Sequence, residues 1–139
     1  MDARSFEVSD TDYLTLAAFR AALRKFLRTS EEIAHGLGLT PQKHQAMLAV
    51  RGFPGDHPPT ISQLAAKLHV RHNSAVGLIT RIEKEGYVKR EKSKQDARRI
   101  HVRLTPKGQA VLDKLTEAHR TELRHIGPEI TRLLKELTR

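Results

Sequence analysis

The segment Lys92–Arg99 holds the residues of this chain that are best suited to bind phosphate. It reads Lys-Ser-Lys-Gln-Asp-Ala-Arg-Arg, so a single acid lies among several cations. A guanidinium at the tip of such a loop fits a narrow minor groove of DNA, where the negative potential is enhanced. Because Asp96 lies two residues before Arg98, we expect its carboxylate to hold that arginine in a fixed pose, which lowers the ordering cost of binding. The alternative is an ordinary charged hairpin tip.

A second set of candidate residues lies between Arg71 and Lys84, where the apolar positions follow a helical period. The expected inward positions are Ala75, Leu78, Ile79 and Ile82. On the opposite face, Asn73 can hydrogen-bond a base edge and Val76 can contact a thymine methyl group. Ser74 and the arginines are better placed for phosphates. For each of these residues, solvated surface is the alternative.

Gly77 occupies the outward face of the same helix. A glycine inside a helix costs about 1 kcal/mol relative to alanine. On an exposed face, that cost predicts a close approach of the backbone to the floor of a DNA groove. The alternatives are packing against another helix and mere tolerance of the glycine. The full set of predicted DNA-binding residues is Thr60, Ser62, Arg71, His72, Asn73, Ser74, Val76, Gly77, Thr80, Arg81, Lys94, Asp96, Arg98 and Arg99.

Two short helices joined by a tight turn must position these residues. Thr60 and Gln63 have the spacing of a capping box, which predicts the start of the first helix. His69–Arg71 is the expected turn, and the second helix runs over His72–Glu85 and stops at Gly86, a C-terminal glycine.

The apolar spacing then changes to two, which predicts strands over Tyr87–Glu91 and Arg99–Leu104. The charged loop between them makes this hairpin the wing of a winged helix-turn-helix. From Ile61 to Leu104 there are 11 Lys or Arg and 4 Asp or Glu, so this segment carries +7 of the chain's net charge of +9. A basic patch concentrated on one small unit is typical of phosphate binding.

Long amphipathic helices flank this unit. Apolar residues with spacings of 3 and 4 predict a helix over residues 10–36, and Thr40-Pro41 predicts the start of a shorter helix that runs to Arg51. Thr105-Pro106 begins a long helix that Gly127-Pro128 is expected to break, so that a separate last helix follows.

We therefore predict one α+β domain over residues 1–139, mainly α with a small β wing. Residues 40–104 are the expected DNA-binding lobe, and the helices of 10–36 and 106–139 are the expected dimerisation region; intrachain core is the alternative use of their leucines. A two-fold dimer places its recognition helices about 34 Å apart and requires a palindromic site. The predicted dimer contacts are Leu16, Phe19, Leu23, Ile130, Leu133, Leu134 and Leu137.

Composition excludes several other classes of function. The chain has no cysteine, which excludes disulfides and thiol chemistry. No apolar run approaches the roughly 20 residues that span a bilayer, and the N-terminus does not resemble a secretory signal, so we expect a cytoplasmic protein. We see no metal-ligand spacing, phosphate loop or catalytic constellation, and predict no metal, no cofactor and no enzymatic activity. His35 and His44 are the ligand-binding candidates, with surface histidine as the alternative.

Four motifs resemble those of one protein family. The most specific is Asp96-x-Arg98-x-x-x-Val102-x-Leu104-Thr105-x-x-Gly108. The other three are Leu39-Thr40-Pro41, Ile61-Ser62-Gln63-Leu64-Ala65 and Arg81-Ile82-Glu83-Lys84-Glu85-Gly86-Tyr87-Val88. Together they make the chain similar, over about residues 10–138, to the MarR (multiple antibiotic resistance regulator) family of bacterial transcription factors.

The resemblance implies a homodimer of triangular winged-helix subunits that binds a palindromic operator, usually as a repressor relieved by a small aromatic or phenolic ligand. It implies that the recognition helix enters the major groove and that Arg98 enters the minor groove. The chain departs from the family at Arg71, where a capping Ser is frequent, and at Gly77, where a polar or basic residue is common. We therefore expect fewer direct base contacts and more reading of DNA shape.

Other functions remain open at this point. The main alternative is an architectural winged helix that binds double-stranded DNA without sequence preference and shows a steep salt dependence. An RNA-binding or protein-binding winged helix is a further alternative, although the chain offers few aromatic residues for stacking on single-stranded bases. An enzyme with an unrecognised site ranks last.

Overall fold

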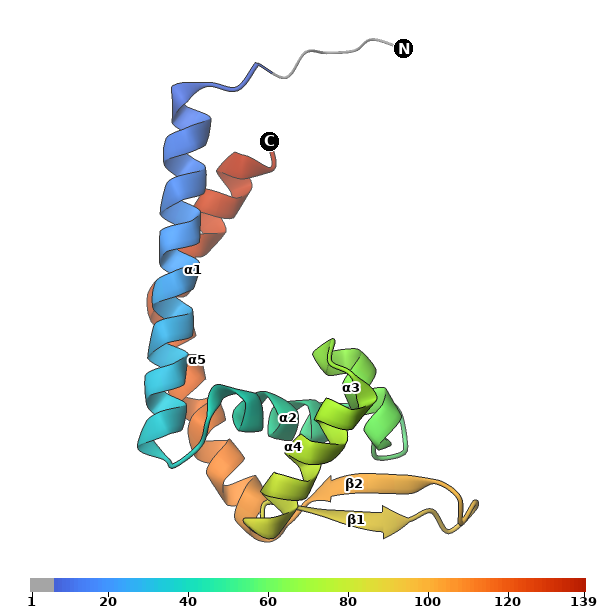
Figure 1. The fold of residues 1–139 in the computed structure, drawn as a ribbon. Coiled ribbons are helices and arrows are strands. Elements are labelled where there is room, and N and C mark those ends of the chain that lie inside the picture. The colour runs from blue at the N-terminus through green and yellow to red at the C-terminus, as the bar shows by residue number, and fades with distance from the viewer. Residues whose placement is uncertain (1–6) are drawn as a thin grey trace, which may run out of the picture. The chain divides into compact units, whose positions relative to one another are not determined.

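The computed structural model describes residues 7–139, which form five helices and one two-stranded sheet (Figure 1). This confirms the predicted fold class, mainly α with a small β wing. The elements are α1 (Asp10–Gly36), α2 (Pro41–Arg51), α3 (Ile61–Leu68), α4 (His72–Lys84), β1 (Val88–Lys92), β2 (Ile100–Leu104) and α5 (Pro106–Leu137). They divide into two compact units, residues 31–117 and residues 1–30 with 118–139, of which the structure describes 7–30 and 118–139.

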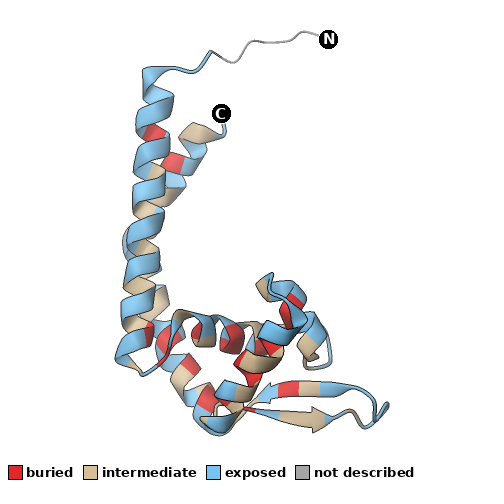
Figure 2. Ribbon diagram, viewed as in Figure 1, coloured by how far each residue is buried: buried red, intermediate tan, exposed pale blue. Residues whose placement is uncertain are grey.

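The unit of residues 31–117 contains the hydrophobic core (Figure 2). Its fully buried side chains come from α2, α3, α4, both strands and the start of α5, so every element of the unit contributes to one core. They include Met47, Leu64, Ile79, Ile82, Val88, Val102 and Leu115. This unit is wider than the predicted lobe of residues 40–104, because it also takes in the end of α1 and the start of α5.

The helix starts follow the predicted capping signals. Thr40 Oγ1 accepts the backbone N–H of Lys43 at 3.3 Å, with Pro41 at the first helical position. Thr60 and Gln63 form the complete capping box: each side-chain oxygen accepts the other residue's backbone N–H, at 3.2 Å and 2.9 Å. Such caps satisfy backbone donors that the first turn of a helix leaves unpaired.

The turn between α3 and α4 depends on one residue in a left-handed conformation. His69 has φ +54°, and its backbone N–H bonds back to the end of α3. Arg71 follows as the N-cap of α4 and makes no capping hydrogen bond through its side chain. The departure from the family pattern at Arg71 therefore has a structural counterpart: the first turn of α4 lacks a side-chain cap.

The wing is an antiparallel hairpin in which Val88 pairs with Leu104 and Lys92 with Ile100. The loop before α3 also pairs with the second strand of this hairpin. Thr60 forms an isolated bridge with His101, and the Val102 N–H donates to the Pro59 carbonyl at 2.9 Å. The start of α3 is thereby tied to the second strand of the wing.

The other unit consists of two antiparallel helical segments, Asp10–Ser30 of α1 and Ala118–Leu137 of α5. Thr15 Oγ1 donates to Glu136 Oε2 at 3.4 Å near one end. Near the other end, Ser30 Oγ and His119 Nε2 lie 2.5 Å apart. No helix in the described part of the chain is long and apolar enough to cross a membrane.

The predicted break at Gly127-Pro128 is wrong, because α5 continues through Pro128 to Leu137. A proline removes one i to i−4 hydrogen bond and costs about 3 kcal/mol inside a helix. Tertiary packing offsets that local cost here: Leu133, one turn later, is only 2% exposed, and Glu136 bonds to α1. Local helix preference is routinely overridden in this way.

Candidate nucleic-acid interface

Helix α4 has the two faces that its sequence predicts. Ala75, Leu78, Ile79 and Ile82 are all buried. The predicted DNA-binding residues occupy the other face. Those exposed are Arg71, His72, Asn73, Ser74 and Arg81, while Val76, Gly77 and Thr80 are partly buried. The exposed positions cluster at the N-terminal end of the helix, which is the end that meets base edges in helix-turn-helix proteins.

A groove of about 540 Å³ separates the start of α3 from the wing. It brings together predicted residues from three places in the sequence: the N-terminus of α3, the N-terminus of α4 and the end of the wing loop. Its lining consists of Thr60, Ile61, Ser62, Gln63, His72, Arg98, Arg99 and Ile100. Five of these residues were predicted from the sequence, and together they present hydroxyl, imidazole and guanidinium donors that suit phosphate oxygens.

The tip of the wing is ordered by Asp96, but mainly through the backbone. Asp96 Oδ1 accepts the backbone N–H of Arg98 at 3.0 Å, and the Arg99 N–H donates to the Asp96 carbonyl at 3.0 Å. The Arg98 guanidinium is 97% exposed, with its Nε 4.0 Å from the carboxylate. The expected fixed pose of Arg98 therefore holds for its backbone, while its guanidinium projects into solvent, where a ligand can reach it.

The outer face of the hairpin carries a short network of charges. Glu91 Oε1 lies 2.8 Å from Lys89 Nζ, and Glu91 Oε2 lies 2.9 Å from Arg103 Nε. The hydrogen bond from Lys89 is the largest cause that lowers the pKa of the Glu91 carboxyl. Desolvation opposes it, and the positive charges of Lys89 and Arg103 lower the pKa further. Glu91 is therefore ionised at neutral pH and neutralises part of the basic charge of the wing.

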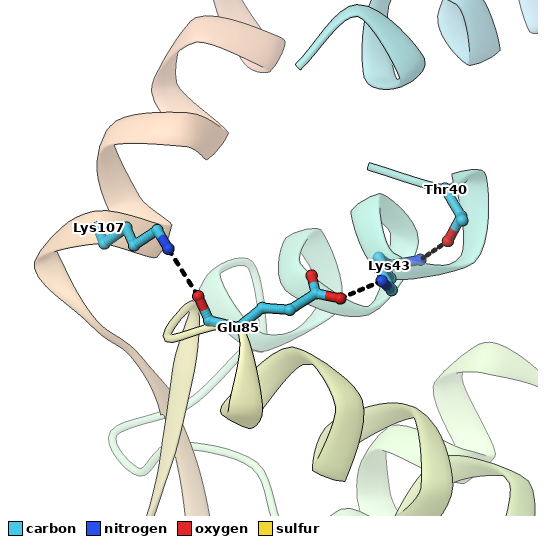
Figure 3. Close-up of polar contacts among 4 residues, drawn as sticks. All are labelled: Thr40, Lys43, Glu85 and Lys107. Carbon is cyan, nitrogen blue, oxygen red and sulfur yellow. Dashed lines mark hydrogen bonds and ion pairs between the residues drawn. The ribbon is translucent and has the colours of Figure 1, made fainter. Parts of the chain in front are cut away.

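The C-terminal end of α4 is held by two lysines from other helices (Figure 3). Lys43 of α2 forms an ion pair with the Glu85 carboxylate, and Lys107 of α5 donates from Nζ to the Glu85 carbonyl at 2.7 Å. Lysines are favourable at a helix C-terminus because they complement the dipole and satisfy free carbonyls. Helix α4 is thereby anchored at the end remote from its exposed N-terminal residues.

Gly108 explains part of the specific motif that follows the wing. The Thr105 N–H donates to the Tyr87 carbonyl at 3.0 Å, and Thr105 Oγ1 accepts the Gly108 N–H at 3.0 Å as the cap of α5. A Cβ on Gly108 would lie 2.0 Å from the Tyr87 carbonyl oxygen, a distance that no side chain tolerates. Only glycine lets the first turn of α5 pack this closely against the start of the wing.

Comparison with known proteins relates this architecture to one family. The model of the MarR family matches residues 37–99, which cover α2, α3, α4, β1 and the wing loop. This match confirms the resemblance to the MarR family that the sequence motifs carry.

Two curated proteins that this chain is similar to are named as regulators. YkoM of Bacillus subtilis, an uncharacterized HTH-type transcriptional regulator, is 28% identical over 102 residues, which are 73% of this chain and 62% of that protein. PapX of Escherichia coli, an HTH-type transcriptional regulator, is 25% identical over 108 residues, which are 78% of this chain and 65% of that protein. The chain spans less than two thirds of the length of these relatives. Regulators of this kind are not enzymes, which confirms that prediction.

Two solved structures share the fold of this chain. A MepR variant of S. aureus bound to an oligodeoxyribonucleotide aligns with a TM-score of 0.69 at 20% identity, covering 94% of this chain and 99% of that chain. A MarR family protein from Bacillus stearothermophilus aligns with a TM-score of 0.74 at 18% identity, covering 96% and 100%. The winged-helix architecture is therefore shared over nearly the whole length of both structures.

Gly77 has no packing role among the described residues of its unit. A Cβ at this position would meet only Arg81 Nη1, at an ordinary contact distance of 3.7 Å. The backbone has no left-handed conformation at this position either, so alanine would fit without strain. Packing against another helix, one of the alternatives considered from the sequence, has no support among the described residues. The close approach to DNA remains a prediction.

His35 and His44 occupy different environments. His44 is only 8% exposed, so surface histidine, the alternative expected for it, is wrong there. It lies on the inner side of α2 among buried apolar residues, a position that the short apolar pattern of this helix did not reveal. His35 is exposed. Over residues 7–139, no group of three or more His, Cys, Asp or Glu side chains could hold a metal ion.

The predicted dimer contacts lie in the unit formed by the two ends of the chain. Leu16, Leu23 and Leu134 are exposed. Leu133 is only 2% exposed within this unit, so its side chain already packs against other residues of the same chain. The remaining predicted contacts, which are partly buried, are Phe19, Ile130 and Leu137.

Four functional candidates were not found from the sequence. Lys43, Glu85 and Lys107 anchor the end of α4, and their long separation in the chain gives no local signal. Arg90 contacts α4 from the first strand of the wing. Its inward position could have been found from the two-residue period of the strand, because an arginine in an inward row is unusual.

Proposed function

We propose that this chain is a DNA-binding regulator of transcription that acts as a homodimer on a palindromic operator. The observation that carries the proposal is the placement of exposed residues of α4 and of Arg98 in one unit, around the groove between α3 and the wing. The residues of α4 and Arg98 provide separate hydrogen-bond donors for the two grooves of a DNA duplex. They lie on the segment Ile61–Leu104, which has a net charge of +7. The oligodeoxyribonucleotide bound to MepR, a protein of the same fold, supports this proposal.

In this proposal the N-terminal half of α4 lies in the major groove. Asn73 hydrogen-bonds a base edge, and Val76 contacts a thymine methyl group. The guanidinium of Arg98, which is 97% exposed, enters the adjacent minor groove. Arg71 and Arg81 neutralise phosphates on either side.

The homodimer is supported by the distribution of exposed apolar side chains. Eight of the eleven large hydrophobic residues exposed in residues 7–139 belong to the unit formed by the chain ends. They are Val8, Tyr13, Leu14, Leu16, Leu23, Leu27, Leu123 and Leu134. An apolar surface of this kind marks an association site. A two-fold dimer built on it presents two copies of α4 to two half-sites.

We further propose that the regulator is a repressor released by a small aromatic or phenolic molecule. This part rests on the family resemblance, and its test is separate from that of DNA binding. Operator binding is measured while candidate phenolic acids are added, with the NMR signals of His35 and His44 monitored. Release of DNA by at least one such molecule supports the proposal, and unperturbed histidine signals during release would remove these two residues from the site.

The DNA-binding proposal is tested by selecting and sequencing ligands from a random double-stranded library at physiological salt. We expect a palindromic consensus with half-sites about one helical turn, 34 Å, apart. Binding that is salt-sensitive but not selective would replace the proposal with the architectural alternative. A consensus without internal symmetry would retain the regulator but remove the two-fold dimer.

A further inference from the structure

Arg90 of β1 lies on the face of the wing that also carries the apolar residues Val88 and Val102. Side chains alternate along a strand, so Arg90 shares a face with Val88, which is fully buried. Its cross-strand partner Val102 is also fully buried. A guanidinium on this face lies beside the core, where charged groups are rare unless they are paired.

The partners of Arg90 lie along one stripe of the recognition helix. Its backbone N–H donates to Glu83 Oε2 at 2.9 Å. Its Nη2 donates to Thr80 Oγ1 at 2.6 Å and approaches the Val76 carbonyl oxygen at 3.5 Å. Positions 76, 80 and 83 follow the i, i+4, i+7 pattern of one helix face. One residue of the wing thus holds two turns of α4.

Thr80 takes part in this arrangement and not only in the predicted DNA surface. Its hydroxyl donates to the Val76 carbonyl at 2.8 Å while it accepts from Arg90. A hydroxyl has a single proton to donate. Because the Thr80 hydroxyl donates this proton to the Val76 carbonyl, it has no proton to donate to a DNA phosphate. The side chain of Thr80 therefore supports α4.

The cost of this arrangement shows that fold stability alone does not require it. Arg90 Nε is buried and has no hydrogen-bond partner in the described part of the chain. A buried unpaired donor opposes folding, and apolar residues of similar volume often replace buried charges without loss of stability. A methionine at this position would fill the space without the unpaired donor, so the arginine points to a role other than stability.

We propose that Arg90 is a positioning residue for DNA binding, which fixes the orientation of α4 against the wing. Helix α4 and Arg98 can then enter the major groove and the minor groove at the same time. Without the contacts of Arg90, α4 and the wing each keep their own DNA contacts. Part of the binding free energy must then be used to order α4 against the wing. The inference rests on the proposed DNA-binding function, and wild-type binding in the same assay tests that function separately.

The experiment compares Arg90→Met with Arg103→Met, which removes the same charge from the same hairpin. Arg103 pairs with Glu91 and has a side chain 55% exposed. Affinity for the selected operator and for random DNA is measured over a range of salt concentrations, and the thermal midpoint of each variant is recorded. Thr80→Val, alone and combined with Arg90→Met, removes the hydroxyl that links Arg90 to the helix.

We expect Arg90→Met to lower operator affinity about tenfold, with random-DNA affinity, the salt slope and the thermal midpoint nearly unchanged. Thr80→Val should show the same selective loss, and the double variant should lose no more than the stronger single one. Arg103→Met should leave the ratio of operator to random affinity unchanged.

Three results would overturn the proposal. A salt slope reduced by about 0.9 in Arg90→Met would show that Arg90 contacts a phosphate directly. Unchanged selectivity in a folded Arg90→Met protein would remove its positioning role. If Arg90→Met does not fold, a Thr80→Val protein with full selectivity would do the same. A wild-type protein without a preferred DNA site would instead overturn the proposed function itself.

Discussion

One carboxylate at the tip of the wing orders the backbone of the loop that carries Arg98. Asp96 accepts the Arg98 N–H at 3.0 Å, and its own carbonyl accepts the Arg99 N–H at 3.0 Å. The loop is closed further by the Ser93 N–H, which donates to the Arg99 carbonyl at 2.9 Å. These contacts order the backbone below a guanidinium that remains in solvent, so the loop is arranged before any ligand arrives.

Removing the guanidinium tests the minor-groove role directly. Arg98→Ala should weaken operator binding by more than about 1 kcal/mol without unfolding the protein, because its side chain makes no buried contact. Lys114→Ala, which removes one exposed charge from α5, is the control for net charge. Operator affinity is measured by fluorescence anisotropy. An equal loss of affinity in the two variants would show that Arg98 contributes only through its charge.

Asp96→Ala separates geometry from charge, because the two predict opposite signs. Removal of an acid from a basic loop should strengthen DNA binding if only net charge matters. The loss of the Asp96 acceptor should instead weaken binding, because the loop tip must then be ordered when DNA binds. We expect a loss of several-fold in operator affinity at about physiological salt. A gain in affinity would show that the turn at Asp96 has no role in recognition.

Gly77→Ala gives another pair of opposed effects. The substituted Cβ has room, with its nearest contact 3.7 Å away, so the isolated protein should gain about 1 kcal/mol of helix stability. If the backbone approaches the groove floor, the same methyl group should lower operator affinity. Urea unfolding and DNA titration of one preparation measure both quantities. Greater stability with unchanged affinity would mean that Gly77 is merely tolerated.

Among the helices and strands, the features predictable from sequence are those with local signals. The cap at Thr40 was found because Pro41 follows it, and the cap at Thr60 was found because Gln63 lies three positions later. The inward face of α4 was found because its period is regular. Gly108 appeared in the specific motif, but the reason for it, the Tyr87 carbonyl 2.0 Å from a would-be Cβ, requires the tertiary structure.

The features missed from the sequence depend on contacts between distant residues. Lys43 and Glu85 are 42 positions apart, so no spacing rule connects them. The continuation of α5 through Pro128 depends on packing against α1, which outweighs a strong local signal. The candidate DNA surface was largely predictable because exposure follows from amphipathic period. The contacts of Lys43 and Lys107 with Glu85, which hold the end of α4, were not predictable in this way.

The proline in α5 gives a test at the level of this helix. Pro128 is exposed, so Pro128→Ala should restore a helix hydrogen bond without creating a cavity and should raise stability by about 1–3 kcal/mol. Pro106→Ala is the matched control, since Pro106 is also exposed but begins the helix, where proline is favourable. Unfolding must be compared at one protein concentration, because association shifts apparent stability. Equal effects of both substitutions would contradict this account of the α5 interior.

For the whole molecule, the proposed dimer can be tested without damage to the core of the subunit. Deletion after Gly127 is the simplest change, and it should abolish dimerisation. It also removes Leu133, which is 2% exposed and packs within its own chain, so a negative result would not isolate the interface. Point substitutions at exposed leucines avoid this problem. Leu16 and Leu134 are each 47% exposed, and Leu48, which lies in the other unit, is 48% exposed.

We expect Leu16→Glu combined with Leu134→Glu to shift the protein from dimer to monomer in sedimentation experiments, and Leu48→Glu to leave the dimer intact. A buried glutamate in a dimer interface must lose its hydration without a partner, whereas the same residue on a free surface stays solvated. The monomer keeps α4 and the wing, so it should still bind DNA. Because two half-sites no longer act through one linked pair, operator affinity should fall by at least 100-fold, while binding to a single half-site should change little. A monomeric variant with full operator affinity would mean that recognition does not need the dimer, and an intact dimer would place the interface on other residues of the chain.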